Sequence, residues 1–100
     1  MGRLILNSTE TIERPDLAGN ESVENESWMV IVYNNEFNTY EEVVMILLVA
    51  THCTLEEAEI ETWEIDHLGK SNVHFADKEE CETVARIIRQ IGIEVEVKAE

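Results

Sequence analysis

Three polar residues, each followed three positions later by a glutamate, mark where helices begin in this sequence. The pairs are Thr39 with Glu42, Thr54 with Glu57, and Asp77 with Glu80. In such a pair the first side chain accepts a hydrogen bond from a backbone N–H of the first helical turn, and the glutamate accepts one from the backbone N–H of the capping residue. Apolar residues follow each pair at helical spacing, so the sequence predicts helices over residues 39–51, 54–68 and 77–91.

The segments outside these helices have the composition of strands. The expected strands are residues 28–33, 70–75 and 93–98. The first is β-branched and aromatic, as buried central strands are, and it ends at Asn34 and Asn35. The second is weaker, with Ser71, Val73 and Phe75 on one side, and the third alternates between apolar and charged residues. For this β-α-α-β-α-β order we expect an α+β two-layer sandwich, with three helices on a three-stranded antiparallel sheet.

The first predicted helix is apolar on nearly all sides. Its inner face carries Val43, Ile46, Leu47 and Ala50, and its other faces carry Val44, Met45, Leu48 and Val49. Such a helix packs on more than one side or presents an apolar face to a partner, for which Met45, Leu48 and Val49 are the candidates. In the second predicted helix, Ile60 and Trp63 lie off the inner stripe and need another neighbour.

The chain is strongly acidic, with 22 acidic residues against 7 lysines and arginines and a net charge of −15. Such a surface repels phosphate backbones and anionic membranes, so we expect no nucleic-acid and no membrane partner, and favour a protein with a basic face. Residues 1–27 are polar and poor in aromatic residues, so they are expected to form a flexible acidic N-terminal tail before a core domain over residues 28–100.

No stretch reaches the roughly 18 apolar residues of a membrane span, and the first residues do not form a secretory signal. The sequence therefore predicts a cytoplasmic protein of one domain, in which Cys53 and Cys81 are reduced.

The residue types that most often carry catalysis or bind metals form no recognised motif here. Cys53 follows His52 at a helix start, but adjacent residues rarely point together and the glutamates nearby oppose a thiolate. The candidate metal ligands His52, Cys53, Asp66, His67 and His74 have no zinc-binding spacing. The four glycines form no phosphate-binding loop. We therefore expect a protein that is not an enzyme and that binds no metal or other cofactor.

Sequence motifs within residues 28–100 resemble those of ClpS, the adaptor of the Clp protease that delivers N-degron substrates. That family follows an apolar strand with an Asn-Asp-Asp-aromatic-Thr-Pro-Met turn and a helix. The turn here reads Asn34-Asn35-Glu36-Phe37-Asn38-Thr39-Tyr40. The family closes its second helix with Val-His shortly before Gly-Lys, where this chain has Ile65-Asp66-His67-Leu68 and then Gly69-Lys70.

The resemblance implies a binding mechanism. ClpS-like domains hold the first residue of a degradation substrate: a polar rim grips the free α-amino group, and an apolar pocket takes a side chain of Leu, Phe, Tyr or Trp. By position, the residues implied at the amine are Asn34, Asn35, Glu36 and Asp66. Those implied in the pocket are Asn38, Tyr40, Thr62, Ile65 and Val95. The implied partners are substrate N-termini and a Clp-type AAA+ unfoldase.

Several of these positions depart from the family pattern. Asn35 replaces an acid and Asp66 replaces the amine-binding histidine, so we hypothesise that the negative charge has moved across the site. Tyr40 is bulkier than the family's methionine and narrows the pocket or changes its preference, and Thr62 brings a hydroxyl where a longer apolar side chain is usual.

Three other interpretations compete with the adaptor. The main alternative is a divergent ClpS-like protein that binds the unfoldase or another protein without recognising N-degrons. A ribosomal-stalk-like domain ranks lower because such domains offer basic residues to their partners. An enzyme built on His67 and the surrounding acids ranks lowest.

Overall fold

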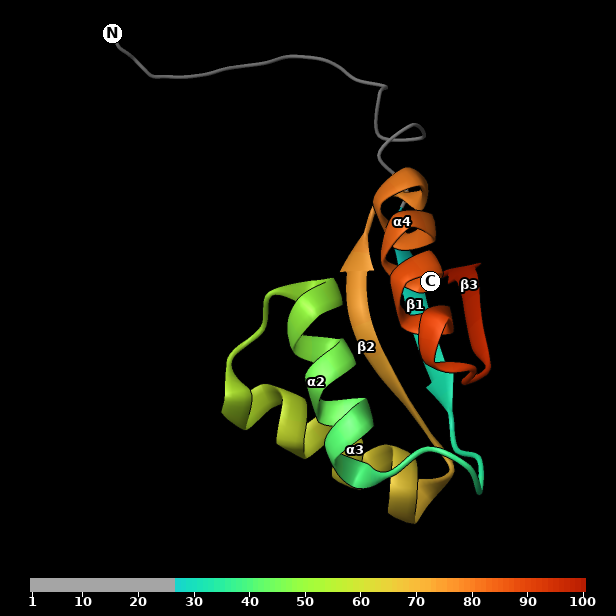
Figure 1. The fold of residues 1–100 in the computed structure, drawn as a ribbon. Coiled ribbons are helices and arrows are strands. Elements are labelled where there is room, and N and C mark those ends of the chain that lie inside the picture. Colours follow the sequence, from blue (N-terminus) through green and yellow to red (C-terminus); the bar gives the residue numbers. More distant parts are fainter. Residues whose placement is uncertain (1–26) are drawn as a thin grey trace, which may run out of the picture.

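The computed structural model describes residues 27–100, which fold into a layer of helices against a three-stranded antiparallel sheet (Figure 1). In chain order the elements are β1 (Trp28–Tyr33), α2 (Tyr40–Thr51), α3 (Leu55–Leu68), β2 (Lys70–Ala76), α4 (Lys78–Ile88), the 3-10 turn η1 (Arg89–Ile91) and β3 (Val95–Ala99). The expected α+β sandwich and its β-α-α-β-α-β order are confirmed. The expected tail lies outside the described residues, except for Ser27.

β1 is the central strand of the sheet, with β2 on one side and β3 on the other. α4 lies along the sheet and contacts all three strands, while α2 and α3 pack together beside β2 (Figure 1). The side chains at the centre of the core are fully buried: Val30, Val32, Leu47, Ala58, Cys81, Ala85 and Ile88. This arrangement leaves the end of β1 next to the start of α2 and the end of α3. In the described part of the chain, no helix is long and apolar enough to cross a membrane.

The helix starts follow the capping pairs, with one difference. Thr39 and Thr54 each form a complete capping box, in which the threonine Oγ1 accepts from the glutamate N–H and the glutamate accepts from the threonine N–H. Asp77 also accepts from the N–H of Glu80, at 2.8 Å. The Glu80 carboxylate, however, lies 2.7 Å from His74 Nε2 and does not return to the cap. The third pair is therefore half of a capping box, because a neighbouring strand offers Glu80 a better partner.

The prediction that Phe75 shares a side of β2 with Ser71 and Val73 is wrong. The pairing of β2 with β1 shifts by one residue between Val30 and Ile31, so β2 contains a bulge. A bulge inserts an extra residue and reverses the alternation beyond it. Ser71 and Val73 are buried as expected, but Phe75 is 55% exposed.

The N-terminal cap of α3 provides a test of how much a capping box contributes to the free energy of unfolding. We expect Thr54→Ala to lower the free energy of unfolding by about 1 kcal/mol, because the N–H of Glu57 loses its acceptor. Thr83→Ala is the matched control: Thr83 is exposed within α4, its hydroxyl bonds only the Glu79 carbonyl, and alanine favours the helix. Urea unfolding of both variants measures the difference, and equal losses would contradict a capping role for Thr54.

Candidate functional site

A small pocket of about 110 Å³ lies where β1 ends, α2 begins and α3 ends. Its lining consists of Asn34, Asn35, Asn38, Thr39, Tyr40, Val43, Thr62, Ile65 and Asp66. Seven of the nine residues singled out from the sequence therefore surround one pocket, although they come from two segments that are far apart in the chain. The roles assigned to them at an amine or a side chain remain predictions.

Glu36 and Val95 are the two that do not line the pocket. Glu36 is exposed on the turn. Val95 is 7% exposed and belongs to the core cluster, because it pairs with Val32 of the central strand. Val95 therefore contributes to the core and does not line this pocket, and a role for it at a bound side chain stays a prediction.

Asn35 builds the turn between β1 and α2. Its Oδ1 accepts hydrogen bonds from the backbone N–H groups of Phe37, at 3.1 Å, and Asn38, at 3.0 Å. Its Nδ2 donates to Asn38 Oδ1 at 2.8 Å. This is the local turn geometry that asparagine favours. The Asn35 oxygen is thus already used by two donors, which leaves it a weaker candidate for binding an amine than its position in the sequence indicates.

Asn38 fastens this turn to two other elements. Its Nδ2 donates to the Ile91 carbonyl at 2.8 Å and to Glu42 Oε1 at 3.1 Å. The backbone N–H of Thr39 and the Asn38 amide together hold the pKa of Glu42 below its usual value. Because the turn is anchored at η1 and at the first turn of α2, the residues on its inner side are preorganised around the pocket.

Asn34 is held beside the end of α3. Its backbone N–H donates to the Gly69 carbonyl at 2.9 Å. Gly69 ends α3 with a φ of 93°, a conformation that side-chain-bearing residues rarely adopt, and its N–H donates to the Ile65 carbonyl. This contact brings Asn34 and Asp66 to the same pocket.

Four of the lining side chains are apolar or have their polar group satisfied. Val43 and Ile65 are buried aliphatic residues. Thr62 is 2% exposed, and its hydroxyl donates to the Ala58 carbonyl at 2.7 Å, so it presents no unpaired polar group to the pocket. The Tyr40 hydroxyl donates to the Glu59 carbonyl at 3.1 Å, so the tyrosine reaches from α2 to α3 as one wall.

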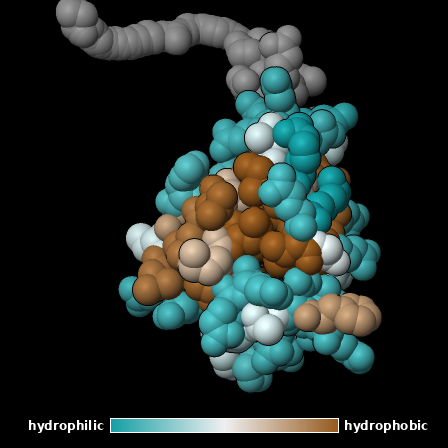
Figure 2. Space-filling model, in the orientation of Figure 1, coloured by the Kyte–Doolittle hydropathy of each residue, from teal (hydrophilic) through white to brown (hydrophobic). Residues whose placement is uncertain are grey.

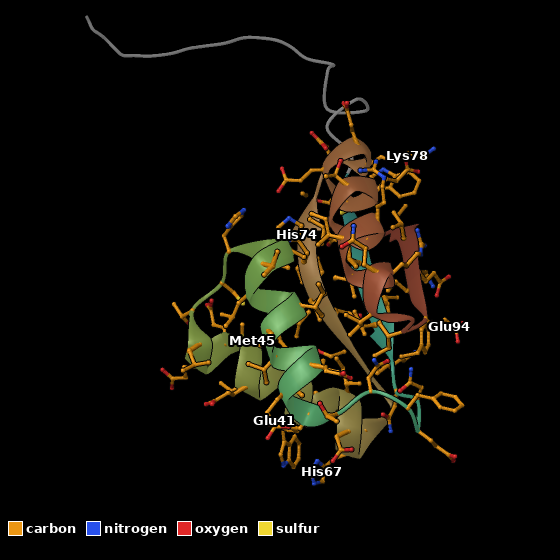
Figure 3. All side chains as sticks on the ribbon, in the orientation of Figure 1. Glu41, Met45, His67, His74, Lys78 and Glu94 are labelled. Carbon is orange, nitrogen blue, oxygen red and sulfur yellow. The ribbon has the colours of Figure 1, made fainter. Side chains whose placement is uncertain are left out.

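Asp66 is the one charged residue in the lining. Its side chain is 60% exposed, and its Oδ2 lies 3.6 Å from His67 Nδ1. The His67 ring stacks on Trp63, with the ring centroids 4.3 Å apart, and lies at the outer edge of the molecule (Figure 3). His67 does not line the pocket. The pocket therefore combines the aliphatic side chains of Val43 and Ile65 with a largely polar lining that includes one carboxylate, a mixture that suits a small cation attached to an apolar group.

Two lining residues were not predicted as site residues. Thr39 was interpreted as a helix cap and Val43 as part of an apolar helix face, and both descriptions hold. Both residues lie at the start of α2, directly after the loop that follows β1. That position was the sequence signal that could have identified them as lining residues. Within residues 27–100, no group of three or more histidine, cysteine, aspartate or glutamate residues is placed to hold a metal ion.

A second hollow follows the outer side of α2. It has a volume of about 330 Å³ and is lined by Glu41, Glu42, Met45, Ile46, Val49 and Ile91. Figure 2 shows apolar side chains gathered over α2 and the adjoining part of α4, inside a rim of hydrophilic residues. Met45 projects from this side of α2 (Figure 3). The nearly uniform apolar character expected of this helix therefore leaves an open apolar groove.

Glu61, next to Thr62 on α3, makes stability depend on pH. Its Oε1 is buried with no hydrogen-bond partner among the described residues. Burial, with Glu57 and Glu64 nearby, raises its pKa to about 7. The folded protein therefore holds a proton that the unfolded chain releases above its ordinary pKa of about 4.3, so stability falls as the pH rises towards 7.

We expect Glu61→Gln to raise the free energy of unfolding at pH 8, by an amount on the order of 1 kcal/mol after allowing for solvent screening of a partly buried side chain. At about pH 3, more than one unit below the ordinary glutamate pKa of about 4.3, the side chain is largely neutral in both states and the gain should vanish. Urea unfolding at the two pH values tests this, with the exposed α4 residue Glu82 changed to Gln as the control. A gain independent of pH would contradict the explanation.

A family model described as the ATP-dependent Clp protease adaptor protein ClpS matches residues 23–96. Among curated proteins, the E3 ubiquitin-protein ligase ubr-1 of Caenorhabditis elegans is 33% identical over 58 residues, which are 58% of this chain and 3% of that protein. The E3 ubiquitin-protein ligase UBR2 of Homo sapiens is 32% identical over 63 residues, 63% of this chain and 4% of that protein. The chain thus corresponds to a small part of each ligase.

Among solved structures, Agrobacterium tumefaciens ClpS2 bound to L-phenylalaninamide has the same fold, with a TM-score of 0.71 and 15% identity. The match covers 76% of this chain and 99% of the other. With the family match over residues 23–96, the resemblance noted in the sequence is confirmed: this chain belongs to the ClpS family of Clp protease adaptor proteins.

Proposed function

We propose that this domain is a degradation adaptor that binds protein N-termini by the free α-ammonium group and an apolar first side chain. The observation that carries the proposal is a single carboxylate, Asp66, at the edge of a pocket walled by Val43, Ile65 and Thr62. A charged acceptor binds an ammonium group about twice as strongly as a neutral one. The related ClpS2 was solved with L-phenylalaninamide, a ligand with a free α-amine and an aromatic side chain.

Within this proposal, the side chains of Asp66 and Asn34 accept hydrogen bonds from the ammonium group. Asn35 and Asn38 hold the turn in place. Glu36 adds negative charge near the rim without lining the pocket. This division of roles includes the hypothesis that the charge lost at Asn35 has been replaced at Asp66.

The pocket volume sets the proposed preference for the first residue. A dry apolar cavity of about 150 Å³ accommodates benzene. A pocket of about 110 Å³ is smaller than that, and the Tyr40 wall is tied to α3. We therefore expect leucine to bind better than phenylalanine or tyrosine, and tryptophan to bind least well.

The family description assigns such adaptors to the Clp protease, so a Clp-type AAA+ unfoldase is the proposed partner. The matches to ubiquitin ligases offer a second destination for the same captured N-termini. Delivery to either partner would begin with the same binding event at this site, the capture of an N-terminal residue.

Fluorescence anisotropy with short labelled peptides tests the proposal. Peptides that begin with Leu, Phe, Tyr or Trp are each compared with their N-acetylated twins. Binding that acetylation abolishes is the expected result, since acetylation removes the charge and two donors from the amine. If free and acetylated peptides bind equally, or none binds, N-terminal recognition is excluded.

The apolar groove along α2 favours one other function, a ClpS-like domain that binds a protein partner without recognising N-termini. Met45 and Val49 are more than half exposed in this groove. This alternative predicts that Met45→Glu removes partner binding while amine dependence is absent from the start, so the acetylation comparison separates the two functions.

A further inference from the structure

Tyr40 is a wall shared by the candidate pocket and two further hollows on the surface. One, of about 330 Å³, is lined by Tyr40, Glu56, Glu59, Ile60 and Trp63. The other, of about 360 Å³, is lined by Tyr40, Glu41, Val44, Met45 and Glu59. We call the first of these the acidic aromatic groove. Tyr40 lines both this groove and the pocket.

The groove continues the site in the direction away from the amine. The Tyr40 hydroxyl bonds the carbonyl of Glu59, which precedes Asp66 by seven residues, or about 10 Å along a helix at 1.5 Å per residue. The proposal takes a peptide with its ammonium group at Asp66 and its first side chain in the pocket to leave on the Tyr40 side, where the groove lies. An extended chain advances about 3.3 Å per residue, so its second to fourth residues span this distance.

The groove has a definite chemical character. Trp63 and Ile60 are 48% and 52% exposed, and with Tyr40 they provide aromatic and aliphatic surface. Glu56 and Glu59 add two carboxylates, and no lysine, arginine or histidine is part of the lining. His67 stacks on one face of the Trp63 ring, so the other face and the ring edge are what the groove offers. Aromatic faces beside carboxylates attract cations and long aliphatic stems, which lysine and arginine combine in one side chain. An acidic side chain would meet two like charges.

We propose that the acidic aromatic groove binds the second to fourth residues of the captured N-terminus and selects lysine or arginine there over aspartate or glutamate. The inference rests on the proposed function, since it places the same peptide along α3. The sequence indicated no packing neighbour for Ile60 and Trp63. Binding of a peptide would explain why these two large apolar side chains are exposed.

The test uses peptides with leucine first and with lysine, alanine or glutamate at the second to fourth positions, each also in N-acetylated form. We expect the lysine peptide to bind about five- to tenfold more tightly than the alanine peptide, given one exposed cation–π contact and one or two surface ion pairs. The glutamate peptide should bind more weakly than the alanine peptide. In the double variant E56Q/E59Q this ranking should collapse.

The double variant E79Q/E82Q is the matched control, because it removes the same two charges from the exposed side of α4. It should keep the ranking of the wild-type protein. If both double variants lose the preference equally, the effect is general charge and the groove is excluded. If the three free-amine peptides bind with equal affinity while acetylation still abolishes binding, the proposed selectivity of the groove is wrong and the proposed function stands. If no free-amine peptide binds, both fail.

Discussion

Asp66→Asn is expected to weaken the binding of a free-amine peptide by about tenfold and to remove most of its advantage over the acetylated twin. The substitution keeps the shape and the hydrogen-bonding oxygen of the side chain but removes its charge. Charge-assisted hydrogen bonds exceed neutral ones by roughly 1 to 1.5 kcal/mol, which corresponds to about a factor of ten. Because the Asp66 side chain is 60% exposed, solvent screens the interaction, and a much larger loss is not expected.

The matched control is Glu82→Gln, which removes one charge from an exposed position on α4. It should leave the affinity for both peptides within about twofold, because charges beyond a Debye length of about 10 Å are largely screened. Anisotropy titrations of the two variants with leucine-first peptides supply the comparison. An unchanged affinity in Asp66→Asn would show that Asp66 is only a surface acid.

Asp66→Asn should weaken peptide binding but raise the free energy of unfolding. Asp66 lies in the last turn of α3, where the helix dipole is negative and a carboxylate is unfavourable by about 0.3 to 1 kcal/mol. His67, at 3.6 Å, offsets this only when it is protonated. The positive charge of a bound ammonium group would interact favourably with the Asp66 carboxylate and with the negative end of the helix dipole, and would so offset their mutual repulsion. An acid placed where it destabilises its own helix is therefore consistent with a binding role.

The sequence predicted the fold well because its local signals agree with one another. Complete capping boxes at Thr39 and Thr54 position two helices, and the order of the strands then leaves few ways to build a sheet. The errors lie where tertiary partners decide. Glu80 turns to His74 on a neighbouring strand, and the bulge in β2 moves Phe75 to the other face. Neither effect has a signature in the spacing of residues along the chain.

The candidate site shows the same limit. Asn34 and Asp66, which the family position had pointed to, line one pocket although 31 residues separate them, and their roles there stay predictions. Position alone could not show that the Asn35 oxygen is already bonded to two backbone N–H groups, or that Val95 faces the core. Which atoms remain free to bind a ligand depends on hydrogen bonds that form only after the turn has folded.

Thr62→Leu is expected to reduce binding of leucine-first and phenylalanine-first peptides by tenfold or more while leaving the protein as stable or more stable. Thr62 is buried in α3 and lines the pocket, and its hydroxyl is bonded within the helix. A leucine side chain would extend into a space of about 110 Å³ and occupy much of it. Filling a cavity with apolar atoms commonly adds about 0.5 to 2 kcal/mol to the free energy of unfolding.

Thr83→Leu is the matched control for this change. Thr83 makes the same kind of hydroxyl bond, to the Glu79 carbonyl at 3.1 Å, but it is exposed on α4 and lines none of the hollows described above. It should leave peptide affinity unchanged. Urea unfolding and anisotropy on both variants decide the matter, because opposite changes in stability and affinity are what a filled ligand pocket produces. A loss of both in Thr62→Leu would point to overpacking of α3 against the core, and unchanged affinity would place the first side chain of the peptide elsewhere.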